Sequence, residues 1–448
     1  MAAGRVAVVG AGLAGLAAAL DLTNAGFEVE VFERSRLLGG RATSFVVDGV
    51  EVDNGQHVFL ACCTELLGFI ERVGMAHAVR MQPRFEALVF GKDGRQSRLR
   101  AAGLPAPWHL IASFVGYRHI GWSSKAKVAY ALAKTADAAR SSESFAGWLA
   151  RTGQPDDALR AFWRPFFVPA LNAPLEQARA ADAAFILSTA FLAAPDAARF
   201  GYTSVPLARV AEAAANRLKA VHPSTAVTGL ELSSSGSRAA RIRTSSGAST
   251  SFDAVILAVA PPHLVRLAGD PDVLHVPSLD AFAPHAIVDV HIWHDAGSIG
   301  VDFAALLDSP VQWIFEKGNG YVCCSLSAAD AWADQPAQRI VDMCWSEASR
   351  SVRKLRGARL VRSAVTRQPE ATYLLAPGVR RPGNATALPN VAIAGSWTDT
   401  GWPDTMEGAV RSGLNAVIAL HEHADNEDAV SQLNADMNNA DSVREVRS

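Results

Sequence analysis

The sequence has few cysteines, few charges and no long apolar run, and each shortage excludes a class of protein. Its five cysteines include no CxxC spacing, and charged residues make up only 19% of the 448, with a net charge of −2. The cysteine pattern disfavours a metal or redox-pair site, and the charge is too low for a nucleic-acid partner. A membrane-spanning helix needs about 18 uninterrupted apolar residues, which no segment provides. These shortages predict a cytoplasmic protein without metal or nucleic acid, with peripheral contact to the inner face of the membrane left open.

A glycine-rich motif between two predicted strands is the most informative feature that is present. Val6–Val9 predicts a short buried strand, and the sequence GAGLAG follows it at once. In this pattern Gly10 permits a tight turn, Gly12 lets the backbone approach a pyrophosphate, and Gly15 lets the helix pack against the strand. The predicted helix Leu13–Ala25 directs its first amides toward the phosphates. This segment predicts a dinucleotide-binding site.

The residues after this motif favour FAD among the dinucleotides. A second predicted strand, Phe27–Phe32, places Glu33 eighteen residues after Gly15. A carboxylate at this point accepts both ribose hydroxyls and repels a 2′-phosphate, which favours FAD or NAD over NADP. The loop Leu38–Ala42 then adds two glycines and Arg41, whose guanidinium suits phosphate oxygens. A nicotinamide dehydrogenase does not need this second loop, so the sequence predicts FAD.

The C-terminal part returns to a strand, a glycine-containing loop and a helix. Val391–Ala394 predicts the strand and Thr405–Leu420 the helix. Asp404 is the expected N-cap, with Glu407 three residues later in an arrangement close to a capping box. The positive end of this helix suits the flavin edge that becomes negative on reduction, and Gly408 and Gly413 are expected to let the helix lie against a ligand.

These patterns predict an α/β fold, with a Rossmann-type FAD-binding domain interrupted by a mixed α+β substrate domain that carries a helical cap. The apolar run Asp253–Val259 predicts a further strand of a parallel sheet, whereas residues 60–199 read as mostly helical. The predicted segments are 1–59, 201–267 and 390–422 for the FAD-binding domain, 60–200 and 268–389 for the substrate domain, and 423–448 for a disordered tail.

Four motifs together resemble a known superfamily. They are GAGLAGLAAA, LLGGRA, DNGQHVFL at Asp53–Leu60, and AGSWTDTGWPDTMEGAVRSG at Ala394–Gly413. The sequence resembles the phytoene desaturase/amine oxidase superfamily of flavoproteins, and within it the squalene-associated branch of hydroxysqualene dehydroxylases in hopanoid biosynthesis. The resemblance implies a reductive reaction, in which reduced FAD gives a hydride to an allylic C30 alcohol and the products are squalene and water.

The resemblance also implies which residues contact the cofactor, and it includes two departures. Cys63 stands where an aromatic residue is common after the DNGQH strand. The superfamily usually has an acid after the glycine of the C-terminal motif, where this chain has Ser396. The residues implied for the adenosine and pyrophosphate half are Gly10, Gly12, Leu13, Ala14, Gly15, Glu33, Arg34, Gly39, Gly40 and Arg41. Those implied for the flavin and ribityl half are Gly55, Gln56, His57, Gly395, Ser396, Thr405, Met406 and Glu407.

The implied reaction needs an acid, because an allylic hydroxyl group leaves poorly unless it is protonated. His57 is the first candidate, since it lies in the DNGQH motif and an ordinary histidine titrates near neutral pH. Asp399 is the second candidate, with Asp53 and Asp404 as competitors. The alternative for His57 is a structural histidine that is satisfied by the backbone.

A long hydrocarbon substrate also needs an extended apolar cavity. Trp108–Trp122 and Ala183–Ala194 supply apolar stretches. The first is interpreted as a cap helix that faces the core, with an interfacial helix at the membrane as the alternative. Trp397, Trp402 and Phe59 are candidates to stabilise positive charge through their rings, or simply to form walls.

Three other functions stay open at this point. A carotenoid-type desaturase or isomerase would share the fold and the tunnel, but with the opposite electron flow. An amine oxidase would need polar or acidic residues near its substrate, which the apolar insert disfavours. A non-catalytic flavin-binding partner of prenyl synthases would keep residues 5–41 and lack an open cavity, and prenyl synthases of the same pathway are also possible partners of an active enzyme.

Overall fold

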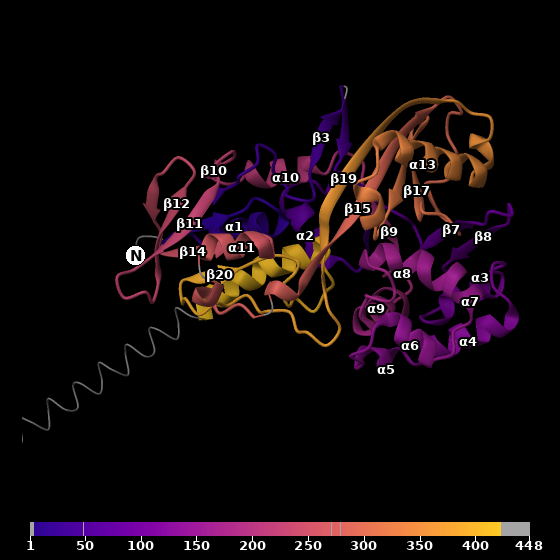
Figure 1. The fold of residues 1–448 in the computed structure, drawn as a ribbon, viewed down its shortest axis with the longest axis horizontal. Coiled ribbons are helices and arrows are strands. Elements are labelled where there is room, and N and C mark those ends of the chain that lie inside the picture. Colours follow the sequence, from indigo (N-terminus) through magenta and orange to yellow (C-terminus); the bar gives the residue numbers. More distant parts are fainter. Residues whose placement is uncertain (1–3, 48, 270, 278, 423–448) are drawn as a thin grey trace, which may run out of the picture.

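The computed structural model describes residues 4–47, 49–269, 271–277 and 279–422. The segment 423–448, for which disorder is predicted, lies outside the described residues. Figure 1 shows an α/β arrangement, with one sheet and its helices on the left, a second sheet at the upper right and a group of helices at the lower right.

The left part is built on a five-stranded sheet in which every neighbouring pair is parallel. Its strands come from all three segments predicted for the FAD-binding domain, and the run Asp253–Val259 does form a strand of it. The domain boundaries themselves stay a prediction. In spatial order the strands are β10 (Ala220–His222), β2 (Glu28–Phe32), β1 (Arg5–Val9), β14 (Ala254–Leu257) and β20 (Val391–Ile393).

Both faces of this sheet are covered, because successive side chains of a strand point to opposite sides. Val6 and Val8 of β1 face a core with the helices, whereas Ala7 and Val9 face a core with the smaller sheet and α11. The helices on the first side are α1 (Leu13–Asn24), α2 (Thr64–Arg72), α10 (Ala208–Ala215) and the final helix (residues 406–422). The elements on the second side are β11 (Val227–Leu232), β12 (Ala239–Thr244), β13 (Ser249–Ser251) and α11 (Pro261–Ala268).

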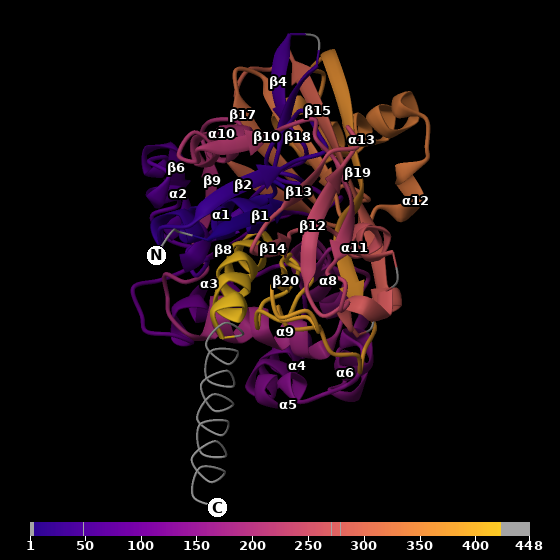
Figure 2. The same ribbon diagram turned by 90° about the vertical axis from the view of Figure 1, so that its left-hand side faces the viewer.

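The final helix lies beside α1, as Figures 1 and 2 show. A Cβ added at Gly413 would come within 2.2 Å of the carbonyl oxygen of Ala14. The expectation that Gly413 lets the helix lie against a ligand is therefore wrong. This glycine lets two helices cross closely.

The second sheet has seven strands, two of which are long enough to connect the two parts of the molecule. Phe282 at the start of β15 packs in the core beside the first sheet, while Val288, Val290 and Ile292 of the same strand pack in the core of the second. In spatial order the strands are β19 (Leu360–Leu375), β15 (Phe282–His294), β18 (Tyr321–Leu326), β17 (Trp313–Gly318), β16 (Phe303–Leu306), β7 (Glu86–Phe90) and β8 (Gln96–Arg100).

The hairpin β7–β8 corrects the expectation that residues 60–199 are mostly helical. Its strands alternate between buried and less buried positions, and Gly91 and Gly94 flank the turn between them. Alternation of period two beside a glycine turn is a hairpin signal. The apolar and alanine-rich composition around it masked that signal.

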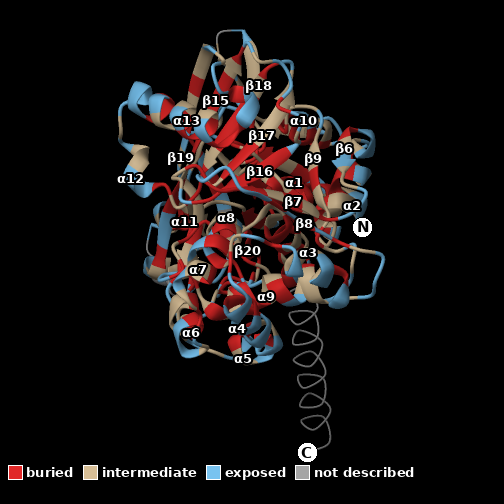
Figure 3. Cartoon of the chain, turned by 90° about the vertical axis from the view of Figure 1, so that its right-hand side faces the viewer, coloured by how far each residue is buried: buried red, intermediate tan, exposed pale blue. Residues whose placement is uncertain are grey.

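The remaining elements are short helices and two small sheets. Buried residues (red in Figure 3) concentrate in the sheets, and exposed residues lie on peripheral helices such as α4 and α12. The helices are α3 (Ile111–Val115), α4 (Trp122–Ala133), α5 (Thr135–Ala139), α6 (Phe145–Arg151), α7 (Asp156–Ala158), α8 (Arg164–Leu171), α9 (Ala180–Ile186), α12 (Asp330–Ala333) and α13 (Ala337–Ser351). The small sheets are β3 (Ser44–Val47) with β4 (Val50–Asp53), and β5 (Phe59–Leu60) with β9 (Phe200–Thr203) and β6 (Val79–Met81).

The segment Trp108–Trp122 does not form the core-facing helix that we expected. It breaks into a 3-10 turn, the five-residue helix α3 and a loop, and none of the residues of α3 is buried. Trp108 is 57% exposed and Trp122 is 70% exposed.

Candidate active site

A cavity of about 1040 Å³ runs from the glycine loops at the end of β1 to the second sheet and the helices α8 and α9. This volume lies at the upper end of the range of about 300–1,000 Å³ that is usual for ligand sites. All residues predicted to contact the cofactor line this cavity, with the single exception of Gly15. The fold thus collects segments that are far apart in the sequence around one space.

The three glycines of the first motif differ in what surrounds them. Gly10 has a φ of +106°, and a Cβ there would lie 2.4 Å from the carbonyl oxygen of Ala258. A Cβ at Gly15 would lie 1.9 Å from the carbonyl oxygen of Gly10, so the helix and the turn touch at this point. At Gly12 a Cβ would meet only the Cα atom of Gly40, 4.0 Å away. Gly12 therefore borders open space, which fits the approach of a pyrophosphate.

Glu33 lies at the end of β2 and is only 8% exposed. Its carboxylate accepts hydrogen bonds from the backbone N–H groups of Ala11 and Ser35, each at 2.8 Å. The N–H group of Gly39 donates to the carbonyl oxygen of Ala11 at 2.8 Å, which joins the two glycine loops. The carboxylate and both loops are thus fixed side by side, and their arrangement fits the adenosine and pyrophosphate of FAD.

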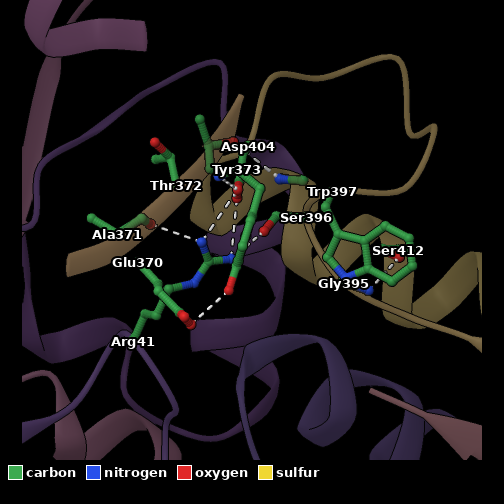
Figure 4. Close-up of polar contacts among 12 residues, drawn as sticks. Arg41, Glu370, Ala371, Thr372, Tyr373, Gly395, Ser396, Trp397, Asp404 and Ser412 are labelled. Atoms are coloured by element: carbon green, nitrogen blue, oxygen red, sulfur yellow. Dashed lines mark hydrogen bonds and ion pairs between the residues drawn. The ribbon is translucent and has the colours of Figure 1, made fainter. Parts of the chain in front are cut away.

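Arg41 is held by protein groups on three other segments (Figure 4). Its guanidinium donates to Ser396 Oγ at 2.6 Å and to the carbonyl oxygen of Ala371 at 2.7 Å, and it forms an ion pair with Asp404 at 3.1 Å. Asp404 also accepts a hydrogen bond from the N–H group of Tyr373 at 2.6 Å. The predicted phosphate contact of Arg41 stays untested, and its main partner here is a carboxylate.

The ion pair shifts the ionisation of both partners. Burial alone would raise the pKa of Asp404, but the charge of Arg41 and hydrogen bonds from Ser396, Arg41 and the Tyr373 N–H group hold it below its ordinary value. Burial disfavours the charged form of Arg41 and would lower its pKa, but the nearby carboxylate of Asp404 raises the pKa of the guanidinium above its ordinary value. Asp404 thus supplies a carboxylate close to Ser396, the position at which the superfamily usually has its acid.

The start of the final helix is capped differently from our expectation. Thr405 Oγ1, and not Asp404, accepts the hydrogen bond from the N–H group of Gly408 at 3.2 Å. The carboxylate of Glu407 accepts from the N–H group of Leu66 at 2.7 Å, at the start of α2, and pairs with Arg411 at 2.7 Å. Asp404 and Glu407 therefore form no capping box. Each carboxylate instead binds groups from other parts of the fold, Arg41 for Asp404 and the start of α2 for Glu407.

The structure brings one of the two predicted acids to the cavity. His57 lines it together with Gly55 and Gln56, and burial lowers the pKa of His57. Its Nδ1 atom is buried and has no hydrogen-bond partner within the described residues. Asp399 is exposed, accepts a hydrogen bond from the N–H group of Gly401, and does not line the cavity. A neutral imidazole is the expected form of His57 at neutral pH, and its role as the acid stays a prediction.

The three aromatic candidates all line the cavity, but they are held in different ways. Trp397 is 1% exposed, and its Nε1 donates to the carbonyl oxygen of Val259 at 3.0 Å. Trp402 packs edge-on against Phe185 with ring centroids 4.9 Å apart. Phe59 is buried in the core beside α1 and α2 and reaches the cavity with part of its ring. All three side chains line the cavity, and Trp397 is fixed there by the protein core.

Sequence reasoning missed a group of aromatic side chains at the far end of the cavity. Phe200 and Phe303 pack at 4.9 Å and Phe166 and Trp313 at 5.9 Å, and all four line the cavity with Phe315. They come from a helix and from strands of two sheets, so no sequence spacing links them. Alternation in β17 places Trp313 and Phe315 on one face, which was the available signal.

One arm of the cavity is lined by uncharged side chains, whereas Glu370, His263 and Arg266 line the cavity outside this arm. The segments 60–200 and 282–327 contribute only uncharged side chains to it, as far as the described residues go. Thr189, Ala190 and Phe191 reach the cavity from a wide helical turn, Leu187–Leu192, that continues α9. Such turns with π-type hydrogen bonding are frequent at functional sites. This arm suits a large apolar ligand.

Comparison with known proteins places these features in a family. The sequence pattern described as "Flavin containing amine oxidoreductase" matches residues 13–421. A hydroxysqualene dehydroxylase of Zymomonas mobilis is 27% identical over 93% of this chain and 99% of its own length. A probable zeta-carotene desaturase of Synechococcus elongatus is 25% identical over 93% of this chain and 98% of its own length. A solved structure of a putrescine oxidase, 18% identical, has a similar fold, with a TM-score of 0.73 over 95% of this chain and 99% of its own.

Proposed function

The chain belongs to the flavin-containing amine oxidoreductase family and is an FAD-dependent oxidoreductase, and from this premise we propose that it removes the hydroxyl group of hydroxysqualene to give squalene. The reaction is a reductive dehydroxylation of a long isoprenoid in hopanoid and squalene biosynthesis. The name of the Zymomonas mobilis relative, which is similar over nearly its whole length, supports this substrate. The relatives named as zeta-carotene desaturases support the broader class of isoprenoid substrates.

The uncharged arm of the cavity is the observation that carries the proposal. An ammonium substrate would lose its hydration there and find no carboxylate in the segments 60–200 and 282–327 that line the arm, as far as they are described. A hydrocarbon gains from the same environment, at about 25 cal/mol for each Å² of apolar surface buried. This arm of the cavity therefore favours an isoprenoid over an amine.

The chain's own residues prepare the reaction in three ways. Glycine loops and Glu33 hold the cofactor, whose reduced form supplies a hydride when it is bound. Aromatic side chains such as Phe200 and Trp313 exclude water from the hydrocarbon and present ring faces to developing positive charge. Polar groups at the DNGQH loop and on β18 line the cavity and can offer a hydrogen bond to a departing oxygen.

An anaerobic assay tests the proposed reaction. The FAD-loaded protein, reduced with dithionite, is mixed with hydroxysqualene. We expect flavin absorbance to return as squalene forms in equal amount, because each turnover consumes two electrons. Reduced free FAD with the same substrate is the control. A reduced enzyme that stays reduced and yields no squalene would contradict the proposal.

The same anaerobic assay distinguishes a dehydroxylase from the main alternative, a carotenoid-type desaturase. A carotenoid-type desaturase would instead bleach its oxidised flavin when it is offered phytoene or zeta-carotene, since it takes electrons from the substrate. We expect no bleaching with either compound. A non-catalytic partner of prenyl synthases would respond to none of these substrates.

We further propose that the protein is cytoplasmic and contacts the membrane surface through the segment around α3. No helix in the described part of the chain is long and apolar enough to cross a bilayer. Leu104, Trp108, Ile111, Val115 and Trp122 are all between 45% and 70% exposed. We call these five residues the apolar patch. Contact with prenyl synthases stays a prediction, since no feature of the described surface selects them.

Charge and position both favour a lipid surface as the occupant of the apolar patch. Of the seven Arg and Lys residues between 94 and 136, Arg95, Arg98 and Arg100 pair with Asp93 and Glu86, and Lys125 is buried. The other three are exposed, which suits anionic head groups: Arg118, Lys127 and Lys134. Phe114 packs on Phe162 at 5.5 Å, and Phe162 packs on Phe166 of the cavity wall at 5.9 Å. Few side chains thus separate the patch from the arm in which an isoprenoid would bind.

Vesicle sedimentation tests the membrane contact. Replacing both Trp108 and Trp122 by serine should weaken binding to vesicles with anionic lipid at least tenfold, because burial of a large apolar side chain contributes about 1.5–3 kcal/mol. Val46→Ser is the matched control, since Val46 is 68% exposed and lies on β3, away from the patch. Equal sedimentation of the double variant and the wild type would exclude the patch as the docking surface.

A further inference from the structure

A buried carboxyl group, that of Asp289, lies directly behind the cavity wall at the DNGQH loop. Asp289 belongs to β15 and is 1% exposed. A Cβ added at Gly55 would lie 3.0 Å from its Oδ2, and Gly55 has a φ of +110°. The loop therefore needs glycine at this position both for its conformation and for its contact with the carboxyl group.

The hydrogen bonds of this carboxyl group lead to the cavity. Ser325 faces Asp289 across the β15–β18 ladder, and hydrogen bonding from the Ser325 side chain and the Gln56 backbone lowers the pKa of the carboxyl group. Both Ser325 and Gln56 line the cavity, whereas Asp289 does not. The thiol of Cys323 lies 3.8 Å from Oδ1. The hydroxyl of Ser325 is thus the side-chain link between the carboxyl group and the cavity.

We propose that Asp289 stores the proton that the leaving hydroxyl group of the substrate takes up, and that Ser325 passes this proton into the cavity. The inference rests on the proposed dehydroxylation. A serine hydroxyl both accepts and donates, so Ser325 accepts the proton from Asp289 and donates its own to the departing oxygen. Ser325 is the group that would touch the substrate, and Asp289 acts through it as a positioning residue.

The step balances in atoms and electrons. The carbon–oxygen bond of the substrate breaks, the oxygen takes the proton and leaves as water, and the carbon accepts the hydride that the reduced cofactor supplies. The cofactor loses two electrons and the substrate gains them. Asp289 is left as a carboxylate and regains a proton from solvent before the next turnover.

The ionisation of the surrounding groups agrees with this role. Burial raises the pKa of Asp289 to about 6, and its hydrogen bonds and the charge of Lys317 limit the rise. Burial lowers the pKa of His57, and it lowers that of His291 to about 4, so His291 holds a proton less readily than Asp289 does. The ionisable groups around Asp289 are Lys317 of β17, Asp53 and His57 of the adjoining strand and loop, His291 of β15, and Tyr321, Cys323 and Cys324 of β18.

The other ionisable groups of β18 stay neutral over the same range of pH. Burial raises the pKa of Tyr321 and of the Cys323 thiol. The pKa of the Cys324 thiol is also raised, first by a hydrogen bond with Cys344 and then by burial. No ionisable group of β18 therefore competes with Asp289 for a proton that is lost near pH 6.

Turnover with hydroxysqualene at several pH values tests the relay. Asp289→Asn should lower the rate by about 10²–10⁴-fold, the usual contribution of a positioned acid. In the wild type the rate should fall as the pH rises above about 6, because only protonated Asp289 can give up a proton, and this fall should be absent in Asp289→Asn. Ser325→Ala should lower the turnover rate by a similar factor. Ser325→Thr keeps the hydroxyl group and should retain most of the wild-type rate.

Two controls separate the role of Asp289 from a structural effect. Asp330→Asn makes the same chemical change beside the same strand, where Asp330 pairs with His285 outside the cavity, and it should leave the rate unchanged. His57→Ala should keep the pH dependence that Asp289→Asn removes. Retention of the wild-type rate and pH profile by Asp289→Asn would overturn the proposal.

An infrared titration without substrate gives a readout that does not depend on turnover. The difference spectrum between the wild type and Asp289→Asn should contain a protonated carboxyl band below about pH 6 that disappears above it. Absence of the band at low pH would also overturn the proposal. If the wild type made no squalene at all, the proposed function would fail, and the infrared titration would still decide whether Asp289 holds the proton.

Discussion

Replacing Gly15 by alanine is expected to lower the stability of the protein by about 3 kcal/mol and to leave it largely without FAD. The new methyl group would lie 1.9 Å from the carbonyl oxygen of Gly10, and a backbone oxygen in a tight turn has little room to move. Overpacking usually destabilises by about 1–3 kcal/mol, and a contact this short belongs at the upper end. The measurements are the denaturation midpoint of the apoprotein and the FAD content after purification.

Two other glycines provide matched controls for this prediction. At Gly12 an added methyl group meets only the Cα atom of Gly40 at 4.0 Å, so Gly12→Ala should keep the apoprotein stable and weaken FAD binding at least tenfold. At Gly68 in α2 nothing lies within 4 Å, so Gly68→Ala should affect neither property, apart from a stabilisation of up to about 1 kcal/mol. Equal stability of Gly15→Ala and Gly12→Ala would contradict this assignment of roles.

Asp404→Asn is expected to destabilise the protein by about 2–3 kcal/mol and to loosen FAD binding. The change leaves the guanidinium of Arg41 without its counter-charge, and breaking a fully buried pair usually costs about 3–5 kcal/mol. The expected loss is smaller because the Arg41 side chain is 34% exposed, whereas that of Asp404 is 6% exposed. Asparagine still accepts the hydrogen bond from the N–H group of Tyr373, so the comparison isolates the charge. Thermal denaturation and FAD titration measure the two effects.

The loss of stability caused by Asp404→Asn should become smaller as the pH falls into the acid range. The pKa of Asp404 is held below its ordinary value in the folded protein, so its carboxylate stabilises the fold fully above the ordinary aspartate pKa of about 3.9. This contribution is lost as the pH falls through the lower folded-state value. The stability difference between the wild type and Asp404→Asn should therefore be constant near neutral pH and shrink in acid.

Glu143→Gln is the control for the loss of a charge pair. Its partner Arg151 lies 2.8 Å away, and their side chains are 37% and 49% exposed, so the change should leave the denaturation midpoint nearly unchanged. A similar loss from both substitutions would show that burial does not strengthen the Arg41–Asp404 pair.

Local patterns were enough for the elements that surround the cofactor. The glycine spacing, the position of Glu33 and the apolar run at Asp253–Val259 each depend on a few neighbouring residues. Backbone conformation at these positions is governed by such neighbours, and therefore these predictions agree with the structure. The hairpin β7–β8 could also have been predicted from its alternating apolar and polar residues, but the alanine-rich composition of the surrounding segment masked this pattern.

Partners that are far apart in the sequence were not accessible in this way. Asp404 was expected to cap its own helix, but it pairs with Arg41, 363 residues earlier in the chain. Glu407 was placed in the same capping box, and it binds the start of α2 instead. A carboxylate binds whichever donor the fold brings nearest, and a guanidinium or a free helix end competes well with the local amides.

The glycine-rich start of the chain, by itself, determined a dinucleotide site, and the second loop with Arg41 narrowed it to FAD. Only the tertiary structure decided which side chains share the cavity, that its far arm is aromatic and uncharged, and that Asp289 lies behind its wall. The reason is physical: backbone geometry is a property of neighbouring residues, whereas burial and the pKa of a carboxyl group depend on everything that packs around it. A buried aspartate and an exposed one look the same in a sequence.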